Sequence, residues 1–383
     1  MPAGDGPRAA PYGAARVAAA IKADWSKNPG TRCEIEVRIF EAPPGTTVAG
    51  IAAGLNGMLA GSPIADIGTI LGLSLYSWNS GSLIEAARAI KDTMPGCIIV
   101  AGGPDTASLG MTPSGIAEAT AAPAPFDAVI IGEGEESMTS LVRDVADGTF
   151  APGRIIRAGP IPVAQLATLP SPWLDGTLDP GRYGGAAVEL ARGCPFRCAF
   201  CYESKGLATQ RRFPASLLAR ELEAFAQSGV EEVFVLDPTF NIDERHMAEA
   251  VGIFSRSGDG LRYYLELRGE LITARQAELL SRLDCTVQIG LQSADPAVMK
   301  LVDRPFDPAR FAARLRLLDE EGITWGLDLI YGLPGDTLSG LKKSLGYALS
   351  LGPNHLDVFR LAVLPGTALY DRRRQLGMVS DAE

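Results

Sequence analysis

Long apolar runs and positive charge are both scarce in this sequence. No stretch reaches the roughly 18 to 20 uncharged apolar residues that a membrane-spanning helix needs, and Met1 to Pro11 lacks the apolar centre of a signal peptide. The chain carries 35 Lys and Arg against 45 Asp and Glu, a net charge of −10. Proteins that bind nucleic acid generally need a basic face to replace the counterions on phosphate. We therefore expect a cytoplasmic protein with no membrane partner, and the charge argues against a nucleic-acid partner.

Histidine and cysteine are also rare, with two and six copies in 383 residues. Six cysteines are too few for a secreted disulfide scaffold of this size. Three of them nevertheless crowd into eight residues, as Cys194, Cys198 and Cys201. The only histidines, His246 and His355, are distant in sequence, so a structural zinc site would lack a nearby fourth ligand. Distance in sequence does not forbid contact in space, and zinc stays as a minor alternative.

The pattern of apolar residues predicts alternating helices and strands along the first half of the chain. The buried strands read as continuous apolar runs, which is typical of parallel sheets. Helices are expected at residues 12–27, 47–59, 83–94 and 137–146, and strands at 33–40, 67–75, 97–101 and 128–131.

A second run of the same kind follows a stretch rich in Pro and Gly, from Phe150 to Gly185, which we interpret as an interdomain linker. Six strands with helical crossovers suggest a partial parallel barrel. The strands are expected at 187–190, 233–236, 263–267, 286–291, 326–331 and 356–361, and the helices at 214–228, 243–255, 274–283 and 308–321. The predicted domains are 1–149, a linker at 150–185, and 186–383.

Small and polar residues follow three of the predicted strands in the first half. These are Ser74 to Asn79, Gly102 to Pro104 and Gly132 to Glu135. In open α/β sheets ligands bind beyond the carboxyl ends of the strands, where glycine lets backbone approach a ligand closely. Each glycine could equally serve a tight turn, but the three loops together favour a ligand crevice.

The three clustered cysteines are spaced C-x3-C-x2-C within Arg192 to Tyr202. Three soft thiolates on one loop can hold three corners of an iron–sulfur cube and leave the fourth iron without a protein ligand. Such an open iron can bind a small molecule. Pro, Gly and Arg surround these cysteines, which argues against ordinary core residues.

This loop resembles that of the radical S-adenosylmethionine (SAM) enzymes, with Phe200 at the aromatic position before the last cysteine. The resemblance implies a [4Fe-4S] cluster bound by Cys194, Cys198 and Cys201, with SAM chelating the open iron. Phe200 is then expected beside the adenine. The motif is highly specific, and it follows the first strand of the predicted barrel, as in that family.

Further segments of the second half look like the cobalamin-dependent branch of the family. They lie after the last cysteine and at the ends of the predicted strands, as Glu203 to Gly206, Asp237 to Asn241, Gln288 to Ser293, Asp328 with Gly332 to Gly335, and Leu364 to Thr367. Reactive groups of barrels gather at these strand ends. Glu266 and Arg268 could equally form an ordinary ion pair. The resemblance implies contacts with SAM from Phe200, Tyr202, Asp237, Thr239, Glu266, Arg268, Gln288, Gly332 and Pro334.

The first half is similar to the cobalamin-binding domain of that branch. The rival interpretation is a Rossmann-like nucleotide site, but no G-x-G-x-x-G with an acidic residue about 20 positions on follows the first strand. The predicted fold is therefore α/β, with an N-terminal Rossmann-like parallel sheet of the cobalamin-binding type and a C-terminal partial (β/α)6 TIM-like radical SAM barrel. Cobalamin contacts are expected from Ser74, Tyr76, Ser77, Trp78, Asn79, Gly102, Gly103, Pro104, Gly132, Glu133, Gly134 and Glu135.

Two features depart from the family pattern. Some cobalamin domains supply a histidine beneath the cobalt, but no histidine precedes His246 here. The resemblance then implies a five-coordinate or water-ligated cobalt. In addition, Met1 to Pro11 is too polar for the buried strand with which the family domain opens, and the chain stops soon after the sixth barrel strand. It is either a compact member or a truncated form.

The leading hypothesis is a cobalamin-dependent radical SAM methyltransferase that acts on a small molecule or peptide. Its implied cofactors are the [4Fe-4S] cluster, SAM and cobalamin, and its implied partner is a one-electron donor such as flavodoxin or ferredoxin. Alternatives are a rearrangement or ring contraction without methyl transfer, a tRNA methylthiotransferase, and a non-catalytic corrinoid binder. The acidic charge and the lack of a second cysteine triplet argue against the tRNA enzyme. No residue pattern selects a substrate.

Overall fold

The computed structural model describes residues 10–28, 34–43, 45–60, 68–109, 125–203, 210–258 and 260–379. The chain divides into two compact units, which hold Pro11–Leu178 and Asp179–Glu383. This division falls inside the stretch that the sequence marks as a linker. Among the described helices, none is long and apolar enough to cross a membrane.

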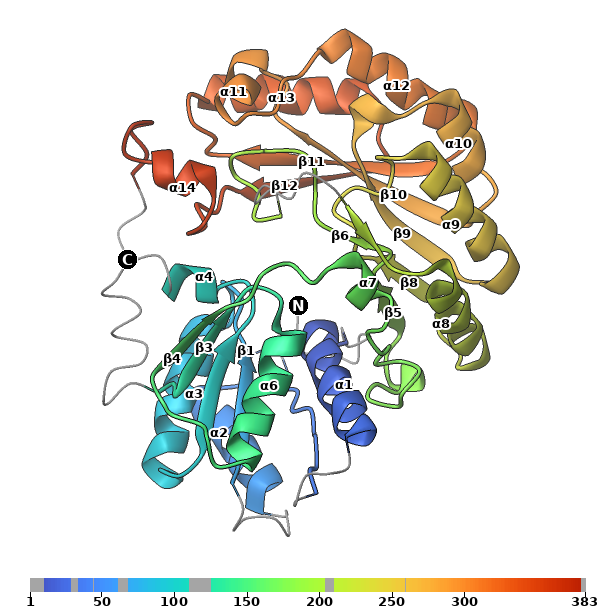
Figure 1. The fold of residues 1–383 in the computed structure, drawn as a ribbon. Coiled ribbons are helices and arrows are strands. Elements are labelled where there is room, and N and C mark those ends of the chain that lie inside the picture. Colours follow the sequence, from blue (N-terminus) through green and yellow to red (C-terminus); the bar gives the residue numbers. More distant parts are fainter. Residues whose placement is uncertain are drawn as a thin grey trace. The chain divides into compact units, whose positions relative to one another are not determined.

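The N-terminal unit is built on a four-stranded parallel sheet with the strand order β1-β2-β3-β4 (Figure 1). The strands are β1 (Ile70–Ser74), β2 (Ile98–Gly102), β3 (Ala128–Ile131) and β4 (Arg154–Arg157). The helices are α1 (Tyr12–Lys27), α2 (Val48–Ala60), α3 (Ser80–Thr93), α4 (Thr106–Leu109), α6 (Gly134–Ala146) and α7 (Val163–Leu166).

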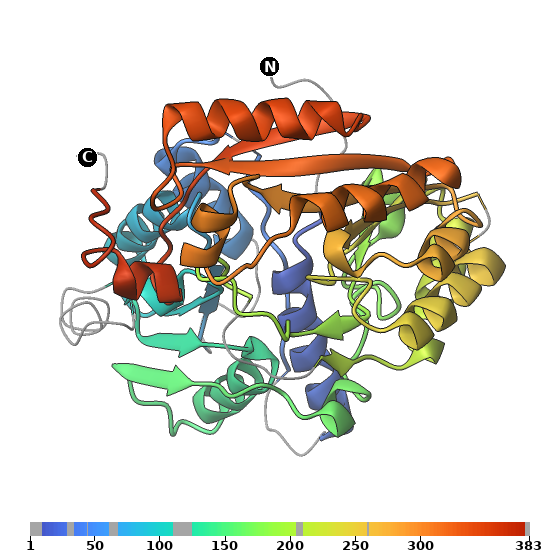
Figure 2. The same cartoon turned by 90° about the horizontal axis from the view of Figure 1, so that it is seen from above.

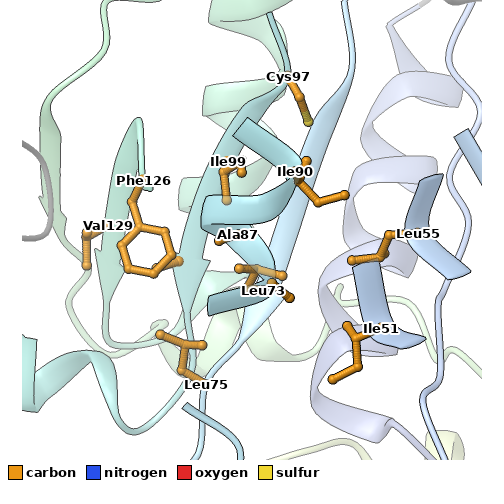
Figure 3. Packing of buried hydrophobic residues seen from close by; sticks show 12 residues of the cluster. Ile51, Leu55, Leu73, Leu75, Ala87, Ile90, Cys97, Ile99, Phe126 and Val129 are labelled. Atoms are coloured by element: carbon orange, nitrogen blue, oxygen red, sulfur yellow. The ribbon is translucent and has the colours of Figure 1, made fainter. Parts of the chain in front are cut away.

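Helices cover both faces of this sheet. Successive residues of each strand point to opposite faces, so neighbouring strand residues pack against different helices. In β2, Ile99 packs with α2 and α3, whereas Val100 packs with α1 and α6. Figure 3 shows the first of these clusters, in which Leu55 and Ile90 approach the strands from the two helices. Burial of an aliphatic side chain of this size stabilises the fold by about 1.5–3 kcal/mol. This two-sided burial explains the continuous apolar runs in the sequence.

One predicted strand, at residues 33–40, is wrong. The described residues 34–43 form no strand, and Cys33 lies outside the described part. The alternation that suggested a strand is real: Ile35 and Val37 pack against the core, while Glu36 points to solvent. The segment is partly buried and pairs with no strand among the described residues. A second difference is that the predicted linker contains the edge strand β4 and the short helix α7.

The C-terminal unit contains a six-stranded parallel sheet with the order β12-β11-β10-β9-β8-β5. The edge strands β12 and β5 pair with no strand on their outer sides within the described residues, so the barrel is partial, as predicted. The strands are β5 (Gly185–Val188), β8 (Glu232–Val235), β9 (Arg262–Leu267), β10 (Cys285–Gln292), β11 (Thr324–Tyr331) and β12 (His355–Arg360). A hairpin of β6 (Ala191–Arg192) and β7 (Arg211–Arg212) is separate from this sheet.

Helices cover one face of this sheet (Figures 1 and 2), and the other face, which we call the open face, carries half-buried strand residues. In β10 the odd-numbered residues are buried, whereas Gln288 and the other even-numbered residues are half-buried. The open face therefore carries the polar strand residues that the sequence singled out. The helices are α8 (Ala215–Gln227), α9 (Glu244–Ser257), α10 (Ala274–Leu280), α11 (Pro296–Leu301), α12 (Pro308–Glu320), α13 (Leu338–Ser350) and α14 (Ala368–Arg372).

Candidate active site

The three clustered cysteines lie on an excursion of the chain between β6 and β7. Ala191 pairs with Arg212 and Arg192 with Arg211, so this antiparallel hairpin closes the excursion at its base. Gly193 has a φ of 90°, a left-handed conformation in which glycine is favoured and which turns the chain out of β6. Residues 204–209, which include part of the predicted motif, lie outside the described residues.

The middle of this cysteine loop is fixed to two other segments of the C-terminal unit. The amide of Ala199 donates to the carbonyl of Val302 at 2.8 Å, and the amide of Leu369 donates to the carbonyl of Ala199 at 2.7 Å. Ala199 is fully buried in an apolar cluster, and Phe200 packs partly buried against it. The predicted contact of Phe200 with adenine, and that of the half-buried Tyr202, stay predictions.

Two guanidinium groups approach the sulfur of Cys198. Nη1 of Arg268 lies 3.5 Å and Nη1 of Arg304 lies 3.9 Å from Sγ. Both arginines are more than nine-tenths buried, and the Arg268 guanidinium lies 3.8 Å from the centroid of the Phe196 ring. Hydrogen bonds to ligating sulfurs tune iron–sulfur clusters, and the partners around a ligand orient it. The surroundings of Cys198 therefore suit a sulfur that carries negative charge.

The residues of the loop fit an iron–sulfur cluster by their chemistry. Cys194 and Cys198 are buried and Cys201 is partly exposed, so one end of the ligand set opens to solvent. In the described residues no three His, Cys, Asp or Glu side chains gather closely enough to hold a metal ion. The thiols thus share one loop but are not drawn together. A cluster at this position would need the loop to tighten around it.

Arg268 does not pair with Glu266, the alternative that the sequence left open. It pairs with Glu270 through Nε at 2.8 Å and through Nη2, and Arg304 lies 3.9 Å from the same carboxylate. Burial acts to raise the pKa of Glu270, but Arg304 and Arg268 outweigh it, and the pKa is lowered. Glu270 therefore holds the two arginines beside Cys198.

Asp237 and Thr239 follow β8 and are both buried. Oδ1 of Asp237 accepts hydrogen bonds from the amides of Leu190 at 2.7 Å and Ala191 at 3.0 Å. Burial raises the pKa of Asp237 to about 7. The Thr239 hydroxyl donates to the carbonyl of Pro238 at 2.6 Å. Both side chains thus contact backbone, and their predicted contacts with SAM stay untested.

Gln288 bridges neighbouring strands on the open face of the sheet. Its Nε2 donates to Asp328 and, at 3.3 Å, to Asp357, while its Oε1 contacts Nε2 of His355. Glu266 lies beside it in register on β9. Burial is the main cause that raises the pKa of Glu266, and the negative charges of Asp328 and Glu203 raise it further. Burial also raises the pKa of Asp328, and the charge of Asp357 adds to this rise. Glu266 and Gln288 thus lie side by side on neighbouring strands, and their predicted contacts with SAM stay predictions. Asp328 belongs to a segment that the resemblance singled out, whereas Asp357 and His355 of β12 are partners that the sequence did not indicate.

The predicted loop after β11 turns at two glycines. Gly332 and Gly335 have φ values of 88° and 79°, and Leu333 between them is buried in the same cluster as Ala199. The loop and the cysteine loop therefore share one core. Pro334 is buried, and the predicted contacts of Gly332 and Pro334 with SAM stay predictions.

Sequence reasoning missed three residues of this region. Arg304 lies at Cys198, as described, and Asn241 exchanges hydrogen bonds with the backbone of Arg268 at 2.9 and 3.1 Å. Gln292 ends β10 with a φ of 68°, and its buried Oε1 has no hydrogen-bond partner among the described residues. Asn241 and Gln292 lie in segments that carry the family resemblance, so their position at the strand ends was the signal that could have identified them. Nothing local distinguishes Arg304.

The loops after β1 and β2 of the N-terminal unit are joined by backbone hydrogen bonds. The amide of Leu75 donates to the carbonyl of Gly102 at 2.8 Å. Asn79 folds its loop, because its Oδ1 accepts from the amide of Tyr76 at 2.7 Å and its Nδ2 donates to the carbonyl of Ser74 at 3.2 Å. Tyr76 stacks on Trp78 with ring centroids 4.6 Å apart, and Trp78 is 78% exposed. The predicted loop thus presents a supported aromatic surface.

Two predicted glycines of these loops are required by close backbone approach. A Cβ on Gly103 would lie 2.5 Å from the carbonyl oxygen of Leu75, and one on Gly132 would lie 2.3 Å from that of Ala158. Both have positive φ values, 96° and 110°. These glycines are explained by the turns alone and carry no argument for a ligand. Of the acidic residues in the third loop, Glu133 accepts from the amide of Ile161 at 2.8 Å.

Glu135, also in the third loop, is 4% exposed and Gly134 begins α6. Ser77 lies in the turn after β1, and Pro104 in the turn after β2. The structure therefore brings the predicted cobalamin residues to the carboxyl ends of β1, β2 and β3. It does not test their contacts with cobalamin.

Comparison with known proteins supports the motif. Residues 188–348 match the model of the radical SAM superfamily. The chain is 29% identical over 343 residues to the cobalamin-dependent radical SAM methyltransferase TokK of Streptomyces tokunonensis, covering 78% of this chain and 48% of TokK. It is 28% identical over 351 residues to the 2-(S-pantetheinyl)-carbapenam-3-carboxylate methyltransferase of Streptantibioticus cattleyicolor, covering 82% of this chain and 50% of that protein.

A solved structure shows the same fold. The radical SAM methyltransferase TsrM from Kitasatospora setae, with tryptophan substrate and a SAM analogue bound, superposes with a TM-score of 0.73 at 17% identity, covering 98% of this chain and 75% of TsrM. This likeness confirms the predicted α/β class with its two parallel sheets.

The similarity to the radical SAM superfamily covers residues 188–348. A radical SAM segment implies a [4Fe-4S] cluster and SAM as cofactors, and for this chain both stay expectations. The chain spans about half the length of the two curated relatives that it matches.

Proposed function

We propose that this chain acts as a cobalamin-dependent radical SAM methyltransferase on a small-molecule or peptide substrate. The observation that carries the proposal is the C-x3-C-x2-C loop, which leaves the carboxyl end of β5 in a six-stranded parallel sheet and has two buried arginines at Cys198. Its N-terminal unit adds a second parallel sheet with loops like those of cobalamin domains. The resemblance to TokK runs over 78% of this chain and so extends beyond the radical SAM segment.

The chain's own residues have three roles in this proposal. Cys194, Cys198 and Cys201 hold the cluster, and Arg268 and Arg304 donate to the Cys198 sulfur. The bound cofactors supply one-electron cleavage of SAM at the cluster and a methyl group carried by cobalamin. The cysteine loop, packed through Ala199, excludes water from the side of the buried sulfurs.

The loops of the N-terminal sheet would hold cobalamin without a histidine ligand, because the first histidine is His246. The exposed Trp78 ring, supported by Tyr76, offers an apolar surface to a large planar ring. The open face of the C-terminal sheet, with Glu266, Gln288 and Asp328, offers hydrogen-bond partners for SAM or substrate. An external one-electron donor of the flavodoxin or ferredoxin type completes the reaction.

The test is anaerobic reconstitution with iron, sulfide and hydroxocobalamin, followed by incubation with SAM and a reductant. We expect 5′-deoxyadenosine to form, and its formation to require Cys194, Cys198 and Cys201. The chain could instead retain cobalt and cleave SAM but form no methylated product with any candidate acceptor. That result would favour a rearrangement or ring contraction. Retention of cobalt without iron would instead indicate a non-catalytic corrinoid binder.

A further inference from the structure

The entrance to the cysteine loop is held by one buried carboxyl group. Oδ1 of Asp237 accepts two hydrogen bonds from consecutive amides, Leu190 at 2.7 Å and Ala191 at 3.0 Å. Those two residues join β5 to the hairpin strand β6, three residues before Cys194. Asp237 is 1% exposed, and its Oδ2 has no hydrogen-bond partner among the residues that the structure describes.

The exit of the cysteine loop is held by the same segment, the connection from β8 to α9. Nε2 of Gln210 donates to the carbonyl of Thr239 at 3.3 Å, and Arg212 pairs with Asp243 at 2.6 Å. The entrance and exit also contact each other, since the amide of Phe213 donates to the carbonyl of Leu190 at 2.9 Å. One connection therefore contacts both ends of the loop that carries the cysteines.

The Asp237 contacts at the entrance and the Arg212–Asp243 ion pair at the exit differ in burial. The Arg212 and Asp243 side chains are 38% and 40% exposed, and an ion pair so accessible contributes little because water screens it. The hydrogen bonds of Asp237 are buried, and removal of the acceptor would leave two amides without a partner, which is costly. Asp237 therefore holds the chain at the entrance of the loop through buried hydrogen bonds, whereas the Arg212–Asp243 ion pair at the exit is exposed.

We infer that Asp237 is a positioning residue, which fixes Leu190 and Ala191 so that Cys194 and Cys198 present their sulfurs to the cluster. The role rests on the proposed function, because only that function places a cluster on these sulfurs. It differs from the contact with SAM that the family resemblance implies for Asp237. Its side chain acts through the backbone of β6.

The first test uses the chain without a cluster and measures hydrogen exchange of the Leu190 and Ala191 amides. Asp237→Ala removes the acceptor and should speed their exchange at least about 10-fold. Asp237→Asn keeps an acceptor oxygen and should stay within about threefold of the parent chain. Asp127→Ala is the matched control, because Asp127 accepts from the Ile99 amide at 2.7 Å in the other sheet, and it should leave Leu190 and Ala191 unchanged. Unchanged exchange in Asp237→Ala would overturn the inference.

The second test measures iron per chain and the midpoint potential of the cluster after anaerobic reconstitution. Asp237→Ala should retain less than about half of the parent's iron and shift the potential, whereas Asp237→Asn should restore both. Equal loss in Asp127→Ala would mean that general destabilisation is the cause and would overturn the positioning role. A parent chain that takes up no iron would overturn the proposed function, while the exchange experiment would still judge the anchor at Asp237.

Discussion

The two parallel sheets of this chain differ in what their carboxyl ends present. Beyond the C-terminal sheet stand reactive or charged side chains, among them Cys198 with Arg268 and Arg304 at its sulfur. Beyond the N-terminal sheet, the loops are shaped by close backbone approach at Gly103 and Gly132 and by hydrogen bonds of Asn79 and Glu133 to backbone, and Trp78 presents an exposed aromatic ring. The C-terminal site should therefore fail when single side chains change, whereas the N-terminal loops should depend on backbone shape and apolar surface.

The largest effect is expected from the cysteines. Replacement of Cys194, Cys198 and Cys201 together with Ala removes all three thiolates of the loop and should abolish cluster absorbance and SAM cleavage. Cys285→Ala is the control, because Cys285 is a buried cysteine of the same unit whose sulfur contacts the carbonyl of Leu280. Normal formation of 5′-deoxyadenosine by the triple variant would contradict the cluster assignment.

A smaller effect is expected from the arginine at Cys198. Arg268→Ala removes a buried donor 3.5 Å from the sulfur and leaves Glu270 with Arg304 alone. Loss of such a supporting partner typically costs about 10- to 100-fold in metal affinity or activity. The rate of SAM cleavage at saturating SAM should fall by that range. Arg275→Ala removes an exposed arginine paired with Glu278 and should change the rate less than about twofold.

The N-terminal loops should respond to backbone changes. Gly103→Ala places a Cβ 2.5 Å from the Leu75 carbonyl oxygen at a φ of 96°, and should destabilise the N-terminal unit by about 1–3 kcal/mol. Gly81→Ala is the matched control, because Gly81 lies in α3 with open space around it. Alanine in a helix should stabilise by about 0.5–1 kcal/mol. Urea unfolding measures the free energy of unfolding of both variants. An equal change in Gly103→Ala and Gly81→Ala would contradict the requirement for glycine at position 103.

Trp78 separates binding from stability in the same loops. Its side chain is 78% exposed, so Trp78→Ala should change the free energy of unfolding by less than about 0.5 kcal/mol. Retention of cobalamin after desalting should nevertheless fall, because the aromatic surface is lost. Leu338→Ala, at another exposed apolar residue, should alter neither quantity. Unchanged cobalt retention in Trp78→Ala would mean that this ring does not contact the corrin.

The stability of the fold should also depend on pH. Burial raises the pKa of Asp237 to about 7, so the folded chain keeps this proton at pH values where the unfolded chain, with an ordinary carboxyl, has lost it. The stabilisation is complete below about pH 4, the pKa of the unfolded group, and is lost as pH rises through about 7. The drop in thermal midpoint from pH 5 to pH 8 should be smaller in Asp237→Asn. If the thermal midpoints of the parent chain and of Asp237→Asn fell equally from pH 5 to pH 8, this would contradict the raised pKa of Asp237.

Sequence reasoning located most strands of both sheets because buried parallel strands read as apolar runs, as at 128–131 and 286–291. It assigned the edge strand β4 to a linker, and it failed at 34–40, where Ile35 and Val37 alternate with polar residues but pair with no strand among the described residues. Pairing is a property of the tertiary structure and leaves no local signal. The same reason hid Arg304, which comes to Cys198 from 106 positions away. The cysteine loop was predictable because its residues are local.

The most direct test of the whole account is the metal content of the chain after anaerobic reconstitution with iron, sulfide and hydroxocobalamin and subsequent desalting. A [4Fe-4S] cluster on three cysteines together with a corrin in the N-terminal unit predicts about four iron atoms and about one cobalt atom per chain. Iron without cobalt would contradict the proposed methyl transfer through cobalamin. Absence of iron would contradict the role of Cys194, Cys198 and Cys201 on which the account rests.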